Sequence, residues 1–205
     1  MKRSNLIVFI GLIAVVVLII YSLQGGKSAA DYQTFIENDR QVKEEYLKSG
    51  KGSPFVKDNI PFESLKYFPA NEKFNIRAKL ELIEDKKVVN LGTSDGKEQK
   101  YLEYAYAIFD LDEVENKLLI LESMEMGPQR GQLFLAFADE TSGIETYGAG
   151  RYLDVKKIPA ATSVDLDFNL AYNPYCAYSD SFSCPFPPKE NILKVAILAG
   201  EKSYH

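Results

Sequence analysis

The stretch "FNIRAKLELIE", residues 74–84, decides the fold. From Phe74 to Leu82, apolar side chains alternate with polar ones. Successive side chains of a strand point to opposite faces of a sheet, so this period of two predicts a half-buried β-strand. We therefore expect one face of the strand to pack on a core and the other to face water.

Similar strand patterns follow at short spacing. "KKVVNLGTSDG" (86–96) predicts a strand that ends in a hairpin turn at Asp95-Gly96. "QKYLEYAYAIFDL" (99–111) and "NKLLILESM" (116–124) predict two strands joined by an acidic link at 112–115. Further strands are predicted in 131–153, around the turn "DETSG", in "SVDLDFN" (163–169) and in "ILKVAILAGEK" (192–202). Roughly eight strands without helical crossovers predict a mainly β fold, a single antiparallel β-sandwich or barrel-like domain.

The segment before these strands predicts one helix and one loop. Apolar residues recur at near-helical spacing in 31–50, and Gly50 suits the end of a helix that packs on the domain. The next stretch, "GKGSPFVKDNIPFESLKYFPANE" (50–72), contains three prolines and no period. We expect it to be a loop that turns back into the domain, because its aromatic residues favour burial.

The first 30 residues predict where in the cell the protein lies. Lys2 and Arg3 precede an unbroken apolar run, Leu6–Leu23, which would be roughly 27 Å long as a helix and would span a bilayer. We expect an anchor at 1–24, a tether at 25–30 and an extracytoplasmic, periplasmic domain at 31–205 with the N-terminus in the cytoplasm. Cleavage after "SAA" (28–30) is the alternative.

Composition excludes several classes of function. The net charge of −5 argues against a nucleic-acid partner, which needs a basic face. The one histidine, His205, is the last residue. A Ser-His-Asp centre would have to use this chain end as its base, and a Cys/His zinc site lacks ligands. No phosphate-binding or dinucleotide-binding glycine motif is present. We therefore expect no metal and no cofactor.

An ordered set of motifs resembles a known family. "SPF" (53–55) and "YFP" (67–69) precede "FADETSGIETYGAGRYL" (137–153), "DFNLAYNPYCAY" (167–178), "CPFPPKEN" (184–191) and "AGEK" (199–202). From residue 53 onward, over about three quarters of the chain, this order resembles the bacterial family of domains of unknown function 1684. The resemblance implies one β-rich, often exported domain and supplies no roles for its residues. The matching positions are Gly150, Arg151, Asp167, Asn169, Asn173, Pro174, Cys176, Cys184, Pro185, Pro187, Pro188, Glu190, Asn191, Gly200 and Glu201.

Chemistry selects candidate ligand-binding residues from this set. Arg151 is the last of five arginines and follows small residues, so it either anchors an anion or forms a structural pair with Asp167 or Glu201. Asp167 and Asn169 share one face of a predicted strand, which is either solvated or lines a cleft. The candidate set is Arg151, Asp167, Asn169, Asn173, Glu190, Asn191 and Glu201.

The loop 165–191 holds both cysteines of the chain. Outside the cytoplasm, Cys176 and Cys184 most simply form a disulfide, and a reduced pair with one reactive thiol is the alternative. Prolines stiffen this loop, and Tyr172, Tyr175 and Tyr178 offer flat contact area beside a strand. We expect the loop to form the rim of a polar pocket.

Three functions are consistent with this sequence. The leading prediction is a membrane-anchored extracytoplasmic domain that binds a small polar or anionic ligand, or a partner in the cell envelope. A hydrolase or transferase working through Asp167, Glu201 and Arg151 is the second, and a structural envelope protein is the third. Geometry separates them, because a binding or catalytic site requires these side chains to converge in one concave site.

Overall fold

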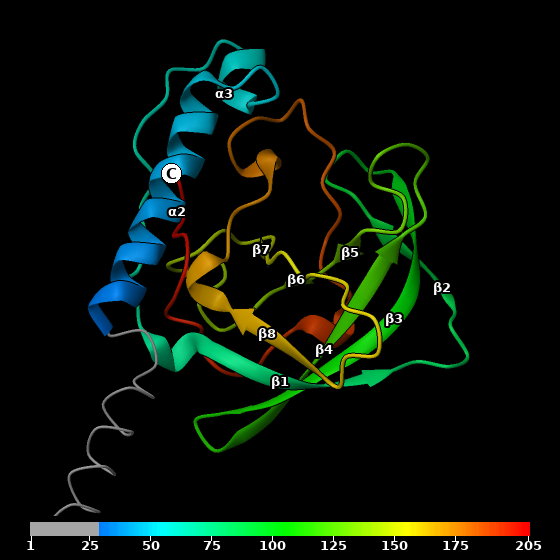
Figure 1. The fold of residues 1–205 in the computed structure, drawn as a ribbon. Helices are drawn as coiled ribbons and strands as arrows, with labels where there is room; N and C mark the ends of the chain where they lie inside the picture. Colours follow the sequence, from blue (N-terminus) through cyan, green and yellow to red (C-terminus); the bar gives the residue numbers. More distant parts are fainter. Residues whose placement is uncertain (1–28) are drawn as a thin grey trace, which may run out of the picture. The chain divides into compact units, whose positions relative to one another are not determined.

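The computed structural model describes residues 29–205 (Figure 1). The predicted anchor, with Leu6–Leu23, and the first part of the tether lie outside the described residues. No helix within 29–205 has both the length and the apolar character needed to cross a membrane. Residues from Ile36 to His205 form one compact unit, and the packing described below is that of this unit.

An antiparallel sheet carries the fold. Its strands are β1 (Asn75–Leu82), β2 (Val88–Gly92), β3 (Glu98–Leu111), β4 (Val114–Ser123), β5 (Leu133–Phe134) and β8 (Ser163–Asp167). The order is β5-β4-β3-β1-β8, and β2 also pairs with β3 (Figure 1). A second, two-stranded sheet joins β6 (Ala136–Phe137) to β7 (Arg151–Tyr152).

The mainly β, antiparallel prediction is confirmed, whereas the barrel is wrong. Among the described strands, β5 and β8 end the path of the larger sheet and do not pair with each other, so the sheet does not close. A barrel needs a complete ring of paired strands. Here the short β6–β7 pair and irregular segments carry much of the remaining chain.

The alternating strand packs as predicted over its first part, whereas Leu82 at its end is exposed. Phe74 and Ala78 are buried, whereas the intervening Arg77 is exposed. In β1, Ala78 pairs with Val164 of β8, and Leu80 pairs with Ala107 of β3. The main core gathers on this face of the sheet and includes Phe109, Leu118, Ile120, Leu135, Phe137, Leu166, Phe168 and Ile197.

The predicted hairpins and helix are also present. Gly96 has a φ of +78° in the turn between β2 and β3. The acidic link between β3 and β4 is shorter than the predicted range 112–115. It consists of Asp112 and Glu113, which have φ values of 53° and 63°. The helix is α2 (Ala29–Ser49), against a predicted range of 31–50.

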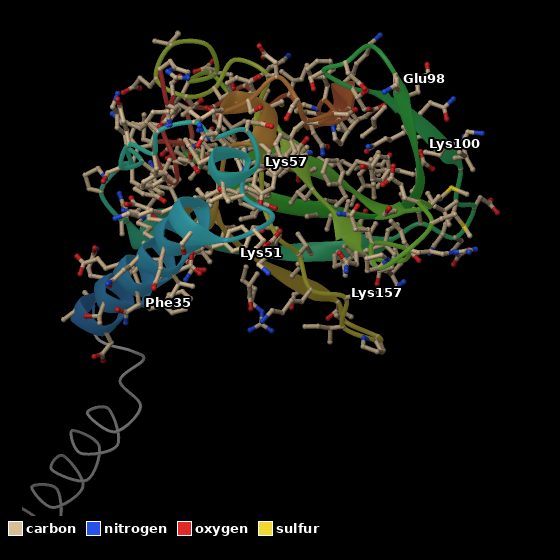
Figure 2. All side chains as sticks on the ribbon, turned by 90° about the horizontal axis from the view of Figure 1, so that it is seen from above. Phe35, Lys51, Lys57, Glu98, Lys100 and Lys157 are labelled. Atoms are coloured by element: carbon tan, nitrogen blue, oxygen red, sulfur yellow. The ribbon has the colours of Figure 1, made fainter. Side chains whose placement is uncertain are left out.

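The proline-rich loop contains a short helix that its lack of period did not reveal. This helix is α3 (Pro54–Lys57), and the Ser53 hydroxyl accepts a hydrogen bond from Phe55 N to cap it. The segment turns back as predicted, since Phe55 and Leu65 are buried with Leu47 of α2 and Tyr178 in a smaller core cluster. Lys51 and Lys57, which are labelled in Figure 2, are exposed beside it.

The last predicted strand, 192–202, is wrong as a strand, although its alternation is real. Leu193, Val195, Ile197, Ala199 and Glu201 are all buried. The segment is therefore extended, but it does not join a ladder of the described sheets. The carbonyl oxygens of residues 197, 199 and 201 instead accept hydrogen bonds from the side chain of Arg151.

Candidate functional site

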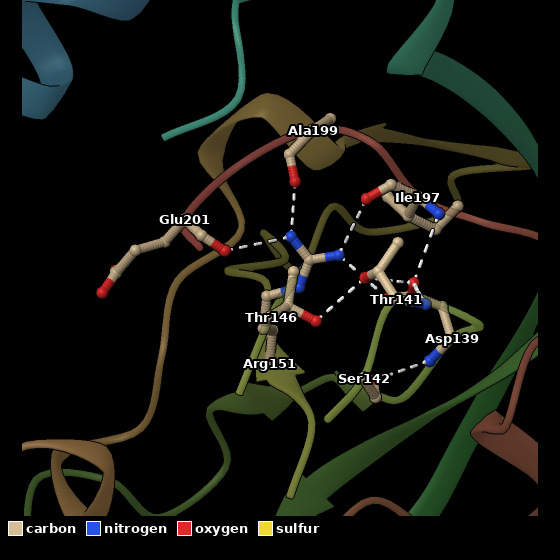
Figure 3. A network of polar contacts seen from close by, with 8 residues as sticks. All are labelled: Asp139, Thr141, Ser142, Thr146, Arg151, Ile197, Ala199 and Glu201. Atoms are coloured by element: carbon tan, nitrogen blue, oxygen red, sulfur yellow. Dashed lines mark hydrogen bonds and ion pairs between the residues drawn. The ribbon is translucent and has the colours of Figure 1, made fainter. Parts of the chain in front are cut away.

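Arg151 occupies the centre of a buried polar network, in which its Nε is the one guanidinium nitrogen without a hydrogen-bond partner among the described residues (Figure 3). It is 0% exposed. Its Nη1 donates to the carbonyl oxygens of Ala199 and, at 3.3 Å, Glu201, and its Nη2 donates to that of Ile197 at 3.0 Å. One guanidinium thus binds three carbonyl oxygens of the extended C-terminal segment, whose other main-chain contacts include isolated bridges at Ile192 and Glu201.

The carboxylate partner of Arg151 is Asp139. Arg151 Nη2 lies 2.9 Å from Asp139 Oδ2, and neither side chain is exposed. Asp139 Oδ1 accepts hydrogen bonds from Thr141 N at 2.8 Å and Thr141 Oγ1 at 2.6 Å. Burial lowers the pKa of Arg151, and the neighbouring Asp139 opposes this shift. Of the two predicted partners, Glu201 accepts a hydrogen bond from Arg151 through its main-chain carbonyl, while its carboxylate acts only through its charge. None of the hydrogen bonds described above joins Arg151 to Asp167.

The Glu201 side chain belongs to an adjoining network. It is 0% exposed and accepts hydrogen bonds from the Tyr178 hydroxyl, from Asn173 Nδ2 at 2.8 Å and from Asn173 N at 3.2 Å. Lys43 Nζ lies 3.5 Å from its Oε2. Burial raises the pKa of Glu201, and Lys43 acts in the opposite direction. Every oxygen of this carboxylate therefore has protein partners.

The buried asparagines act as clamps between main-chain segments. Asn169 exchanges two hydrogen bonds with the main chain of Asn71, at 2.8 and 2.9 Å. Asn191 accepts from Leu119 N at 2.6 Å and donates to the carbonyl oxygens of Leu119 and Ala136 at 2.9 and 2.8 Å. These amides imitate peptide groups where the chain has no regular ladder.

The last two predicted residues have different surroundings. Asp167 caps a 3₁₀ helix, η2 (Phe168–Leu170), through a hydrogen bond from Asn169 N at 3.1 Å. Glu190 is exposed. The predicted residues thus form several separate contacts, and Arg151 and Glu201 are too buried to meet a ligand. A hydrolase that used Glu201 as a catalytic carboxylate would need this side chain to be accessible to the substrate, and it is fully buried.

A cavity of about 520 Å³ lies elsewhere on the described chain. Its lining comes from β3, from the end of β4, the β4–β5 connection and β5, from β7 and the chain just after it, and from the loop 165–191. None of the seven predicted ligand residues lines it, but Cys184 and two of the three tyrosines from the predicted rim do. Its aromatic residues are Tyr101, Phe134, Tyr152, Tyr172, Tyr175 and Phe182.

The aromatic rings of the cavity are held in fixed positions. Tyr101 stacks on Phe134 with ring centroids 4.9 Å apart, and Phe134 meets Tyr152 edge to face at 5.0 Å. The hydroxyl of Tyr152 donates to Pro185 O at 2.6 Å, and that of Tyr172 donates to Asp154 Oδ1 at 2.8 Å. Burial raises the pKa of both tyrosines, so they stay neutral donors at physiological pH.

The polar part of the lining is almost uncharged. It contains three glutamine amides, from Gln99, Gln129 and Gln132, and the hydroxyl groups of Ser123 and Ser183. Asp154 is the one carboxylate in this lining, which includes neither lysine nor arginine. The cavity therefore offers ring faces and neutral hydrogen-bonding groups in one place.

The cysteines differ from the disulfide predicted for them. Both Cys176 and Cys184 are free thiols in the structure. They are nevertheless close, because Cys176 N donates to Cys184 Sγ at 3.1 Å. Cys184 is buried beside the cavity, and Cys176 is half-buried.

Sequence reasoning missed Asp139 and much of the cavity. A local signal for Asp139 was available, since an aspartate two residues before a threonine suits an Asx turn. The β3, β4 and β5 residues of the cavity had no such signal. Their patterns predict strands correctly, but only the pairing order brings them next to the loop 165–191.

Comparisons with known proteins identify a family and a related structure. A search of curated proteins returned no significant match. The solution NMR structure of the uncharacterized protein from gene locus rrnAC0354 of Haloarcula marismortui is similar, with 33% sequence identity and a TM-score of 0.65. The match covers 87% of this chain and 99% of that one. Residues 61–202 match the model described as "protein of unknown function (DUF1684)", and the chain therefore belongs to this family.

Proposed function

We propose that this protein binds a small, neutral, hydroxyl-bearing ligand, such as a carbohydrate ring, in the aromatic cavity. The observation that carries the proposal is the cavity of about 520 Å³ with six aromatic side chains and three glutamines in its lining. Ligand sites of this size typically combine apolar walls with a few placed polar groups. A sugar ring matches both features, because it has an apolar face and a rim of hydroxyl groups.

The charges near the cavity favour a neutral ligand over an anion. Arg151, the predicted anion anchor, is fully buried and paired with Asp139. Lys43 lies over the Tyr172 ring, 4.1 Å from its centroid, but its ammonium group is also 3.5 Å from the Glu201 carboxylate. An anion in the cavity would therefore meet Asp154 without a free cationic partner in the lining.

A thermal-shift screen of the full-length chain tests this proposal. Neutral mono- and disaccharides are the probes, with inorganic phosphate and citrate as anionic comparisons. A ligand present at about 100 times its Kd stabilises the native state by roughly 2.7 kcal/mol, so the melting temperature should rise by several degrees. No shift with any neutral saccharide, together with a shift from the anions, would contradict the proposal.

Matched variants assign a positive result to the cavity. Phe182→Ala removes an aromatic face and Gln132→Ala removes an exposed amide, and both residues line the cavity. Each should reduce the saccharide-induced shift. Glu190→Ala is the control, because Glu190 is exposed and outside the lining, and it should keep the full shift.

We also propose that the apolar run Leu6–Leu23 anchors the chain in a membrane and that residues 31–205 lie outside the cytoplasm. The support is the length of this run and the position of Lys2 and Arg3 before it. Carbohydrate of the cell envelope would then be accessible to the cavity. A reporter fused after His205 should be active only outside the cytoplasm, and cytoplasmic activity would contradict this orientation.

A further inference from the structure

The two cysteines form a preorganised pair at the ends of a short loop. Cys176 lies in a 3₁₀ turn, η3 (Tyr175–Ala177), and its main-chain N donates to Cys184 Sγ at 3.1 Å. The Cys184 thiol also lies close enough to that of Cys176 to affect its pKa. The structure contains no disulfide between them.

The surrounding chain holds Cys184 in place. Ser94, in the turn between β2 and β3, donates its main-chain N–H to Cys184 O at 3.0 Å. Its hydroxyl accepts from Cys184 N at 3.1 Å. Phe186 N donates to Gly92 O at 2.9 Å, which fixes the chain just after the cysteine. Closing a bond to Cys176 would therefore require little rearrangement on the Cys184 side.

The two thiols are chemically unequal. The hydrogen bond from Cys184 lowers the pKa of Cys176 to about 6, burial opposes this shift, and the Tyr147 hydroxyl supports it. Tyr147 Oη lies 3.8 Å from Cys176 Sγ. The interaction with the Cys176 thiol, together with burial, raises the pKa of Cys184. Cys176 is also the more exposed of the two, so it combines thiolate character with access.

We propose that Cys176 and Cys184 form a reversible dithiol–disulfide pair, in which Cys176 is the attacking thiol and Cys184 the resolving thiol. The co-reactant is a low-molecular-weight disulfide, RSSR. The Cys176 thiolate attacks one sulfur of RSSR, which forms a mixed disulfide and releases RS⁻. Cys184 transfers its proton to a released thiolate and attacks Cys176 Sγ, which expels the second RS⁻. The protein dithiol loses two electrons and two protons, and RSSR becomes two RSH.

Trapping experiments on the reduced full-length chain test this order of attack. Oxidised glutathione is the probe, and intact mass with peptide mapping is the readout. Wild type should end as the internal disulfide without retained glutathione. Cys184→Ser should accumulate glutathione on Cys176, and Cys176→Ser should stay unmodified.

Tyr147→Phe should slow the alkylation of Cys176 several-fold at neutral pH and shift its pH profile upward. In denaturant the two cysteines should react at similar rates.

Three results would overturn the proposal. One is glutathione retained on Cys176 in wild type, because Cys184 would then not resolve it. Another is equal reactivity of Cys176 and Cys184 in the folded chain. The third is a disulfide that dithiothreitol reduces only after unfolding, which would make the bond a permanent staple. The readout needs no cavity ligand, so its outcome is independent of the saccharide screen.

Discussion

At the scale of single residues, the polar side chains that dominate the family motifs serve main-chain groups. Arg151 binds the carbonyl oxygens of residues 197, 199 and 201, and Asp139 balances its charge. Burying a guanidinium is costly unless its charge is paired and its donors have partners, and both Nη atoms of Arg151 meet this condition whereas Nε does not. The arginine at this position is therefore explained by its planar fork, which a lysine does not have.

Removing either member of the Arg151–Asp139 pair should destabilise the fold strongly. Breaking a buried ion pair typically costs about 3–5 kcal/mol, because the remaining charge is left without compensation. We expect Arg151→Ala, Arg151→Lys and Asp139→Asn each to lower the free energy of unfolding by roughly this amount. Urea denaturation followed by far-UV circular dichroism measures it. Arg77→Ala is the control, since Arg77 is exposed and should change stability little. Near-wild-type stability of Arg151→Lys would contradict the view that the fork-shaped guanidinium stabilises the fold.

Glu201 should make stability depend on pH in a defined direction. In an unfolded chain a glutamate has a pKa of about 4.3, and burial raises the pKa of Glu201 in the folded protein. The folded state therefore holds this proton more tightly. The contribution of Glu201 to stability is full below the unfolded pKa and is lost as the pH rises through the folded pKa.

The difference in unfolding free energy between wild type and Glu201→Gln should accordingly decrease as the pH rises from about 4. Urea denaturation at a series of pH values measures this difference. Glu190→Gln is the control, because Glu190 is exposed and its substitution should leave the pH profile unchanged. A difference for Glu201→Gln that grows with pH would show that Lys43 and the other donors outweigh burial.

At the scale of elements, sequence periodicity worked wherever a strand has a strand for a neighbour. β1 to β4 appear where the alternation predicts them, and Asp95-Gly96 forms the predicted turn. The segment 192–202 shows the same alternation but is not a strand, because it pairs with other main chain through isolated bridges and Arg151 binds several of its carbonyl oxygens. Alternation reports an extended chain with one buried side, and it does not identify the hydrogen-bond partner.

Gly200 lies within this segment, where the chain passes close to η2. It has a φ of +76°, and a Cβ there would lie 2.7 Å from the carbonyl oxygens of Ala171 and Phe168. Gly96 has almost the same φ, +78°, with nothing within 4 Å of a Cβ. Gly96→Ala should therefore cost only the conformational penalty, roughly 1–2 kcal/mol.

Gly200→Ala should lower the free energy of unfolding by clearly more than Gly96→Ala, because it adds a steric clash to the same backbone strain. Denaturant midpoints of the two variants, measured side by side, give the comparison. Equal losses would mean that the close approach of main chains at Gly200 contributes nothing.

At the scale of the whole molecule, the candidate site could be predicted only in part. The loop 165–191 indicated an aromatic rim, and Tyr172 and Tyr175 do line the cavity, whereas Tyr178 is buried against Glu201. Tyr101 and Phe134 reach the cavity from strands whose order the sequence does not specify. The anion site at Arg151 stays a prediction, and the sequence did not reveal that Arg151 pairs with Asp139, twelve residues earlier in the chain.

We propose that the cavity is the ligand site and that the buried polar residues hold the fold. NMR chemical-shift mapping on the isotope-labelled full-length chain tests it most directly, with a neutral disaccharide and inorganic phosphate as separate probes. We predict that the disaccharide shifts the amide signals of Tyr152, Tyr175 and Phe182, and that phosphate leaves those around Arg151 unchanged. Phosphate-induced shifts centred on Arg151, Asn173 and Glu201, without any disaccharide response at the cavity, would contradict the claim.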